Sequence, residues 1–137
     1  MIPDLQSSIL CDDVRQERNG KFILIGLFDA IGVPKFPVIF HRICVVNRWC
    51  SGEGDFLQRS RFVKPDASTL VEGKDIKIKL SDNEAVATSV EFFMNVKFET
   101  TGTYWVEILL DGDMKLRYPL KVKQVRKGTD LNSREKQ

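Results

Sequence analysis

The alternation of apolar residues near the C-terminal end constrains this chain most. Apolar side chains occupy every second position from Tyr104 to Leu110, and the spacing resumes from Met114 to Val122 after the turn Asp111-Gly112-Asp113. Successive side chains of a strand point to opposite faces, so this period predicts a β-hairpin with one buried face. Tyr104 follows Gly102 at the start of a strand, as the tyrosine corner does in immunoglobulin-like sandwiches.

The register of this hairpin follows from the requirement that both strands agree on the core face. A two-residue Asp111-Gly112 loop would set Ile108 opposite Lys115, and the two faces would disagree. We therefore predict a three-residue loop with four main pairs: Ile108–Leu116, Glu107–Arg117, Trp105–Pro119 and Tyr104–Leu120. Proline lacks an N–H, so Pro119 also predicts that the last strand lies at a sheet edge.

Strand-like runs separated by turn residues continue along the rest of the chain. We expect about eight strands, within the following ranges: residues 7–14, 21–29, 38–49, 56–63, 76–80, 90–98, 104–110 and 114–122. At most one or two helical turns are expected, between Asp82 and Thr88. The pattern predicts an all-β fold, an antiparallel two-sheet sandwich of immunoglobulin-like type, as a single domain over residues 1–125. Residues 126–137 are polar and predict a disordered tail.

Composition and cysteine usage set expectations about the compartment. The longest apolar run, Phe22 to Phe28, is far shorter than the roughly 20 residues of a membrane-spanning helix. The N-terminal residues do not resemble a secretory signal, and three cysteines cannot all pair within one chain. We therefore expect a cytoplasmic protein with reduced thiols and no disulfide.

Two segments resemble an uncharacterised family of small bacterial β-sandwich proteins, a domain of unknown function. The first joins Leu10–Arg15 to Asn19–Asp29, and the second joins Thr101–Gly112 to Pro119–Val122. The resemblance implies the same fold from about Ser7 to Val125. It implies no activity and no functional residues.

The residue types needed for metal binding or nucleophilic catalysis are few. Cys11, His41, Cys44 and Cys50 could form a structural zinc set, but the sequence lacks a C-x-x-C motif. His41 and Cys44 are three residues apart in an expected strand, so they should face opposite ways, and buried thiols are the alternative. The chain has a single histidine, so a Cys–His catalytic pair would require the fold to bring His41 close to a cysteine, which the sequence does not show. No phosphate-binding glycine motif is present, and we expect no cofactor.

Pairs of carboxylates recur along the chain, most of them beside turn residues. They are Asp12 with Asp13, Glu53 with Asp55, Asp82 with Glu84, and Asp111 with Asp113. Each could begin a calcium site, but none has the ligands of an EF-hand loop. Acidic residues beside Gly, Asn or Ser are ordinary turn residues, and we favour that interpretation.

The expected outward faces supply the candidate interaction residues. Phe93, Trp105 and Leu109 are large apolar residues at positions expected to face solvent, which can mark an interface. Lys115, Arg117, Lys121 and Lys123 form a basic stripe on the last strand, where they could contact phosphates or guard an edge against aggregation. We expect a non-enzymatic protein-binding module, with self-association as one mode. Polyanion or nucleic-acid binding through the basic stripe is the alternative, and no membrane partner is expected.

Overall fold

The computed structural model describes residues 1–126, which contain ten β-strands and no helix. The strands are β1 (Asp4–Gln16), β2 (Phe22–Phe28), β3 (Ala30–Val33), β4 (Val38–Cys50), β5 (Gly54–Val63), β6 (Thr69–Glu72), β7 (Ile76–Leu80), β8 (Val86–Phe98), β9 (Gly102–Leu110) and β10 (Asp113–Gln124). The expected helical turns after Asp82 are absent from this range; a turn leads directly into β8.

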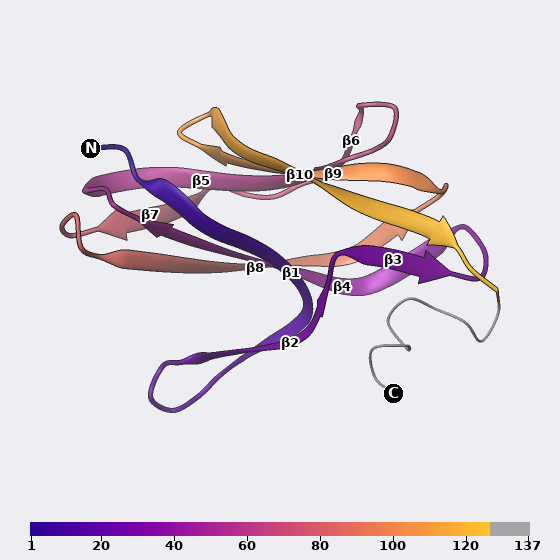
Figure 1. Ribbon diagram of the computed structural model, residues 1–137, viewed down its shortest axis with the longest axis horizontal. Coiled ribbons are helices and arrows are strands. Elements are labelled where there is room, and N and C mark those ends of the chain that lie inside the picture. Colours follow the sequence, from indigo (N-terminus) through magenta and orange to yellow (C-terminus); the bar gives the residue numbers. More distant parts are fainter. Residues whose placement is uncertain (127–137) are drawn as a thin grey trace.

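The strands form two facing sheets, which confirms the predicted all-β two-sheet sandwich (Figure 1). One sheet has four strands in the order β2-β1-β4-β8. The other has six, in the order β3-β10-β9-β5-β6, with β7 also pairing with β5. All strand pairs are antiparallel except β3 with β10, which is parallel. Ten strands replace the expected eight because β3 and β6 are only four residues long and lie where the sequence shows breaks.

The core lies between the sheets and contains the predicted tyrosine corner. Tyr104 is only 2% exposed, and its ring packs edge-on against Phe98 at 5.1 Å between centroids. Its hydroxyl donates a hydrogen bond of 2.8 Å to the carbonyl oxygen of Thr100, in the turn before β9. β4 lies between β1 and β8 with buried residues on both faces, and its apolar residues accordingly do not alternate.

The hairpin of β9 and β10 has the predicted register, but its loop differs from the predicted one. The pairs Ile108–Leu116, Glu107–Arg117, Trp105–Pro119 and Tyr104–Leu120 are all present. The loop, however, has two residues, because Asp111 and Gly112 both have positive φ angles (50° and 86°), as a type I′ turn requires. Leu110 therefore pairs with Asp113, and a bulge between Met114 and Leu116 corrects the register.

The expectation that Phe93 faces solvent is wrong. Phe93 is 4% exposed and packs edge-on against Phe62 across the core, at 5.2 Å between centroids. The cause is Asn95, whose φ of 53° lies in the left-handed region that asparagine tolerates. This residue shifts the alternation of β8 by one position. Val96 is buried after Asn95, and Phe93 is buried before it, although the two residues are three positions apart.

A buried polar cluster lies in the core between the sheets. Gln58 of β5 accepts hydrogen bonds at Oε1 from three side chains of the opposite sheet: Asn47 Nδ2 (3.2 Å), Trp49 Nε1 (2.8 Å) and Ser89 Oγ (2.7 Å). Asn47 Nδ2 also donates to Ser60 Oγ at 3.1 Å. These hydrogen bonds join the two layers. The predicted C-terminal tail lies, except for Arg126, outside the described residues.

Candidate functional site

Strand β2 presents an apolar surface to solvent. The strand is seven residues long, carries no charged side chain, and forms one edge of the four-stranded sheet. Its large side chains are exposed: Phe22 by 39%, Ile23 by 44%, Ile25 by 43% and Leu27 by 51%. We call β2 with these four side chains the apolar edge. Its free side offers backbone N–H and C=O groups that pair with no other described strand.

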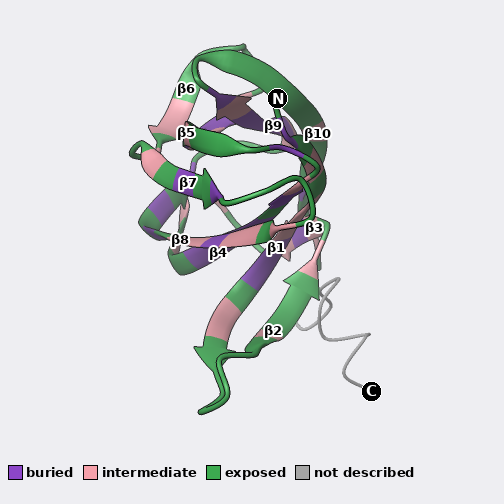
Figure 2. Ribbon diagram, turned by 90° about the vertical axis from the view of Figure 1, so that its left-hand side faces the viewer, coloured by how far each residue is buried: buried purple, intermediate pink, exposed green. Residues whose placement is uncertain are grey.

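The hairpin of β1 and β2 projects away from the sandwich, so this edge is accessible (Figure 2). Glycine at position 26 shapes it: Gly26 has a φ of 71°, and a Cβ there would collide with the carboxylate of Asp12. Gly26 therefore leaves room for the Asp12 side chain on the neighbouring strand.

The other sheet edges in the described range are protected in ways that β2 is not. β3 and β6 have four residues each, and β7 carries Lys77 and Lys79. β8 is long but contains Glu91 and Lys97. Short strands and charged residues are the usual protections against edge-to-edge pairing. β2 is the long and uncharged exception.

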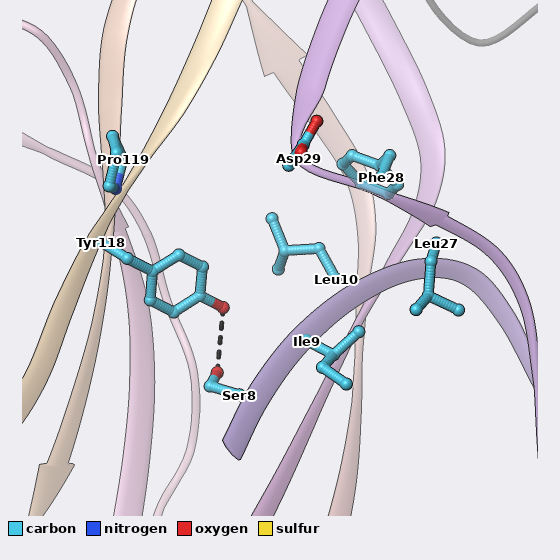
Figure 3. Close-up of a pocket in the computed structure, with 8 residues that line it drawn as sticks. All are labelled: Ser8, Ile9, Leu10, Leu27, Phe28, Asp29, Tyr118 and Pro119. Atoms are coloured by element: carbon cyan, nitrogen blue, oxygen red, sulfur yellow. Dashed lines mark hydrogen bonds between the residues drawn. The ribbon is translucent and has the colours of Figure 1, made fainter. Parts of the chain in front are cut away.

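A hollow of about 340 Å³ lies at the base of the projecting hairpin (Figure 3). It opens where β1 and β2 separate from β10, and it is lined by Ser8, Ile9, Leu10, Leu27, Phe28, Asp29, Tyr118 and Pro119. Tyr118 and Ser8 share a hydrogen bond of 2.9 Å across the gap between the sheets. Burial raises the pKa of Tyr118 to about 12, while the bond to Ser8 lowers it, so this hydroxyl stays protonated at neutral pH. Asp29 supplies an exposed carboxylate at the rim.

The apolar edge continues onto the outer face of the four-stranded sheet. Strand pairing places Leu27, Cys11, Cys44 and Phe92 in one row across β2, β1, β4 and β8. The two thiols are fully buried, and Phe92 is exposed. Burial raises the pKa of Cys44 to about 12, with a further rise from the neighbouring Cys11 thiol, whose own pKa burial also raises. Both thiols are therefore neutral, and they lie beneath the outer face without being exposed on it.

The outward apolar residues expected on the other sheet are covered. The guanidinium of Arg117 stacks on the ring of Trp105, 3.8 Å from its centroid. Leu109 is half-buried and pairs with Arg59 on the neighbouring strand. Trp105 is therefore covered by a charged group, whereas Leu109 lies between Arg59 of β5 and the exposed Met114 of β10.

The four basic side chains of the stripe are exposed as predicted, but they differ in whether a carboxylate already pairs with them. Arg117 Nε donates to Glu107 Oε2 at 3.2 Å, and Glu107 Oε1 also accepts from Arg61 Nε at 2.7 Å. Lys121 and Lys123 lie where β10 pairs with β3, so this part of the strand is not the open edge that was expected. Pro119 lies before that pairing begins. No ion pair among the described residues includes Lys115, Lys121 or Lys123.

The residues considered for metal binding do not converge. Within residues 1–126, no group of three or more His, Cys, Asp and Glu side chains is placed to hold a metal ion. Cys11 and Cys44 pair across β1 and β4, whereas His41 is exposed and Cys50 lies at the far end of β4. All three cysteines are unpaired.

Carboxylates of two acidic turns accept hydrogen bonds from backbone N–H groups. Asp82 Oδ1 accepts from Glu84 N–H, and Asp111 Oδ1 accepts from Leu57 N–H, both at 2.8 Å. These contacts match the interpretation of both residues as turn residues.

Sequence reasoning missed the apolar edge, although its signal was visible. The uncharged run from Phe22 to Phe28 served only to exclude a membrane-spanning helix, and the described residues indeed contain no helix long and apolar enough to cross a membrane. That this run forms an edge strand depends on the strand order, which local pattern does not specify.

Comparison with known proteins places the chain in a family but supplies no activity. A family of unknown function, DUF6941, matches residues 6–123, and the chain belongs to this family. No curated protein sequence matches it. Among solved structures it is similar to the Pseudomonas fluorescens alkylpurine DNA glycosylase AlkC bound to DNA containing an abasic site analog. That similarity has a TM-score of 0.42 and 10% sequence identity, and covers 69% of this chain and 28% of the glycosylase chain.

Proposed function

We propose that this protein is a non-enzymatic binding module that recognises a protein strand at the apolar edge of β2. The observation that carries the proposal is the seven-residue uncharged edge strand with four large exposed apolar side chains. An exposed, apolar edge of this kind is a template for the addition of a further strand. Main-chain hydrogen bonds would provide affinity, and the alternating side chains of β2 would provide selectivity.

The immunoglobulin-like class and a cytoplasmic location form part of the proposal. The hydrogen bond from Tyr104 to Thr100 supports the class, because such a corner is a hallmark of these sandwiches. Three unpaired cysteines favour a reducing compartment.

Polyanion binding through the basic stripe is the second candidate, supported by the three exposed lysines of β10. The charge around them argues for a limited role. On the outer face of the six-stranded sheet, Arg59, Arg61 and Arg117 are each paired with carboxylates. Those carboxylates offset the positive field that would attract phosphates.

Peptide binding tests the proposal. We would titrate fluorescein-labelled ten-residue peptides that alternate isoleucine with threonine into wild-type protein and into the Ile23→Lys variant. We expect binding by the wild type and its loss in Ile23→Lys, with Lys123→Glu as a matched control that binds normally. Absence of peptide binding by a wild type that is monomeric overturns the proposal. Salt-sensitive binding of single-stranded DNA that Lys123→Glu abolishes would replace it with the polyanion alternative.

A further inference from the structure

We infer that the strand recognised at the apolar edge is β2 of a second copy, paired antiparallel about a twofold axis at Ile25. This inference rests on the proposed function, because it names the partner of the same edge. The resulting dimer would join two four-stranded sheets into one continuous sheet of eight strands. An interface of this kind is isologous, since each copy contributes the same surface.

The charges that bound β2 specify this partner and this direction. Lys21 precedes the strand and Asp29 follows it, each four residues from Ile25, and both are exposed. In an antiparallel pair centred on Ile25, the residue numbers of opposed positions sum to 50. The backbone position of Lys21 in one copy therefore lies opposite that of Asp29 in the other, just beyond the paired strand at each end, and the twofold axis repeats this pair of opposite charges. A parallel arrangement in register would instead place like charges together, which is unfavourable.

The hydrogen-bonding pattern of the hairpin is compatible with that register. Glu17 N–H donates to the carbonyl oxygen of Lys21 at 2.8 Å, so the backbone groups of Lys21 point toward β1. These directions alternate along an antiparallel pair, which turns the groups of Phe22 and Leu24 toward the free side. Ile25 would then form a non-hydrogen-bonded pair with its copy on the axis, with a Cα–Cα separation of about 4.5 Å.

Packing also favours this arrangement. Leu24 would oppose Gly26 of the second copy, so that a large side chain meets a position without one. The hairpin projects from the sandwich, which leaves room for a second body (Figures 1 and 2). Its tip would reach the base of the other hairpin, where Asp29 lines the hollow beside Leu27 and Phe28. Seven residues span only about 23 Å. The contact is therefore at the small, transient end of protein interfaces, and the dimer should be concentration-dependent.

Charge reversal tests the register. Sedimentation equilibrium of the wild type should show a reversible monomer–dimer equilibrium. Lys21→Glu and Asp29→Lys should each weaken dimerisation about tenfold, since each places like charges at both symmetry-related positions. The double variant should recover wild-type affinity. Lys123→Glu, a charge reversal outside the interface, should have no effect. Failure of the double variant to recover affinity overturns the register.

Cysteine cross-linking gives an independent measurement in a Cys50→Ser background. Ile25→Cys should oxidise to a covalent dimer, because the two copies of position 25 lie within disulfide reach. Ile23→Cys should cross-link poorly with itself, because its predicted opposite is position 27 of the second copy. Efficient self-cross-linking of Ile23→Cys would overturn the register.

The inference and the proposed function fail differently. If the wild type stays monomeric at every concentration but binds the alternating peptides, the second copy is the wrong partner and the edge still binds strands. If the wild type is monomeric and binds no peptide, both are overturned.

Discussion

The outer faces of the two sheets differ in whether their side chains find interaction partners within the fold. On the six-stranded sheet, Glu107 is held by Arg61 and Arg117, and Arg117 in turn covers Trp105. On the four-stranded sheet, the row from Leu27 to Phe92 contains two neutral thiols, and the adjoining edge is apolar and open. The charged groups of the six-stranded sheet complete one another's contacts, although Leu57 of β5 and Met114 of β10 stay exposed. The other sheet presents apolar groups and unpaired backbone that a partner could cover.

This contrast shows that a face with many charged residues need not have charges that are free to bind a partner. The face rich in arginine looks from sequence like a binding surface, yet its guanidinium groups already have carboxylate partners. The edge with no charge at all is the surface with unfulfilled contacts. Binding surfaces are therefore better sought by asking which groups lack partners within the fold.

Alkaline pH should produce the largest effect, through the thiols of the apolar face. Cys44 has a pKa of about 12 in the folded protein against 9.0 for an unperturbed thiol. Between these values the unfolded chain loses the proton while the folded chain keeps it, so stability is full below pH 9 and falls as pH rises. Each pKa unit corresponds to about 1.4 kcal/mol, which sets the loss at roughly 3–4 kcal/mol by pH 12.

Urea denaturation at a series of pH values measures this loss. Cys44→Val removes one titrating group and should make the decline above pH 9 shallower, with the remainder due to Cys11 and Tyr118, whose pKa values burial also raises. An equally steep decline in that variant would show that Cys44 does not govern the alkaline limb.

Removal of the central carboxylate should have the next largest effect. Glu107→Ala leaves two guanidinium groups close together without their partner, and we expect a loss of about 1–3 kcal/mol in the free energy of unfolding. Glu107→Gln retains one acceptor oxygen for the two guanidinium groups and should lose less. Chemical denaturation of both variants gives the comparison. A loss below about 0.5 kcal/mol in Glu107→Ala, the range of an ordinary surface substitution, would mean that the charged face does not depend on this residue.

Arg117→Ala should expose an apolar side chain on the charged face of the six-stranded sheet. The substitution uncovers Trp105, while Trp49, the other tryptophan of the chain, stays fully buried. We expect tryptophan emission to shift to longer wavelength and quenching by acrylamide to increase. Unchanged quenching would indicate that Arg117 does not shield the ring in solution.

Ile23→Lys should have the smallest effect on stability, even though it should abolish strand binding. Ile23 is exposed on an edge and contributes little to the core, so the free energy of unfolding should change by less than about 0.5 kcal/mol. A large loss, measured by urea denaturation, would assign the apolar edge a role within the fold instead of at an interface.

Sequence patterns predicted the fold where both strands of a pair alternate regularly. The pairing of Ile108 with Leu116 followed from matching core faces, although the bulge beside Lys115 was replaced in the prediction by a longer loop. Phe93 was misplaced because one left-handed residue, Asn95, reverses the alternation, and asparagine also occupies ordinary conformations. The short strands β3 and β6 have too few residues to show a period.

The candidate site was less predictable because it depends on strand order. Nothing local in Phe22–Phe28 distinguishes a buried central strand from an exposed edge, since both can be uncharged and apolar. The basic residues of β10 were identified correctly as exposed, but the neutralisation of Arg117 by Glu107 required the register of two strands.

The buried polar cluster around Gln58 limits how the two layers can slide. One carbonyl oxygen of the six-stranded sheet receives hydrogen bonds from Asn47, Trp49 and Ser89 of the four-stranded sheet. A displacement of one layer by a single residue pair would leave these groups without partners in a dry interior, at a cost of about 1–3 kcal/mol for each group. Apolar side chains alone would tolerate many such displacements. The cluster therefore selects one alignment of the layers, and a strand added at β2 would extend one layer while leaving that alignment intact.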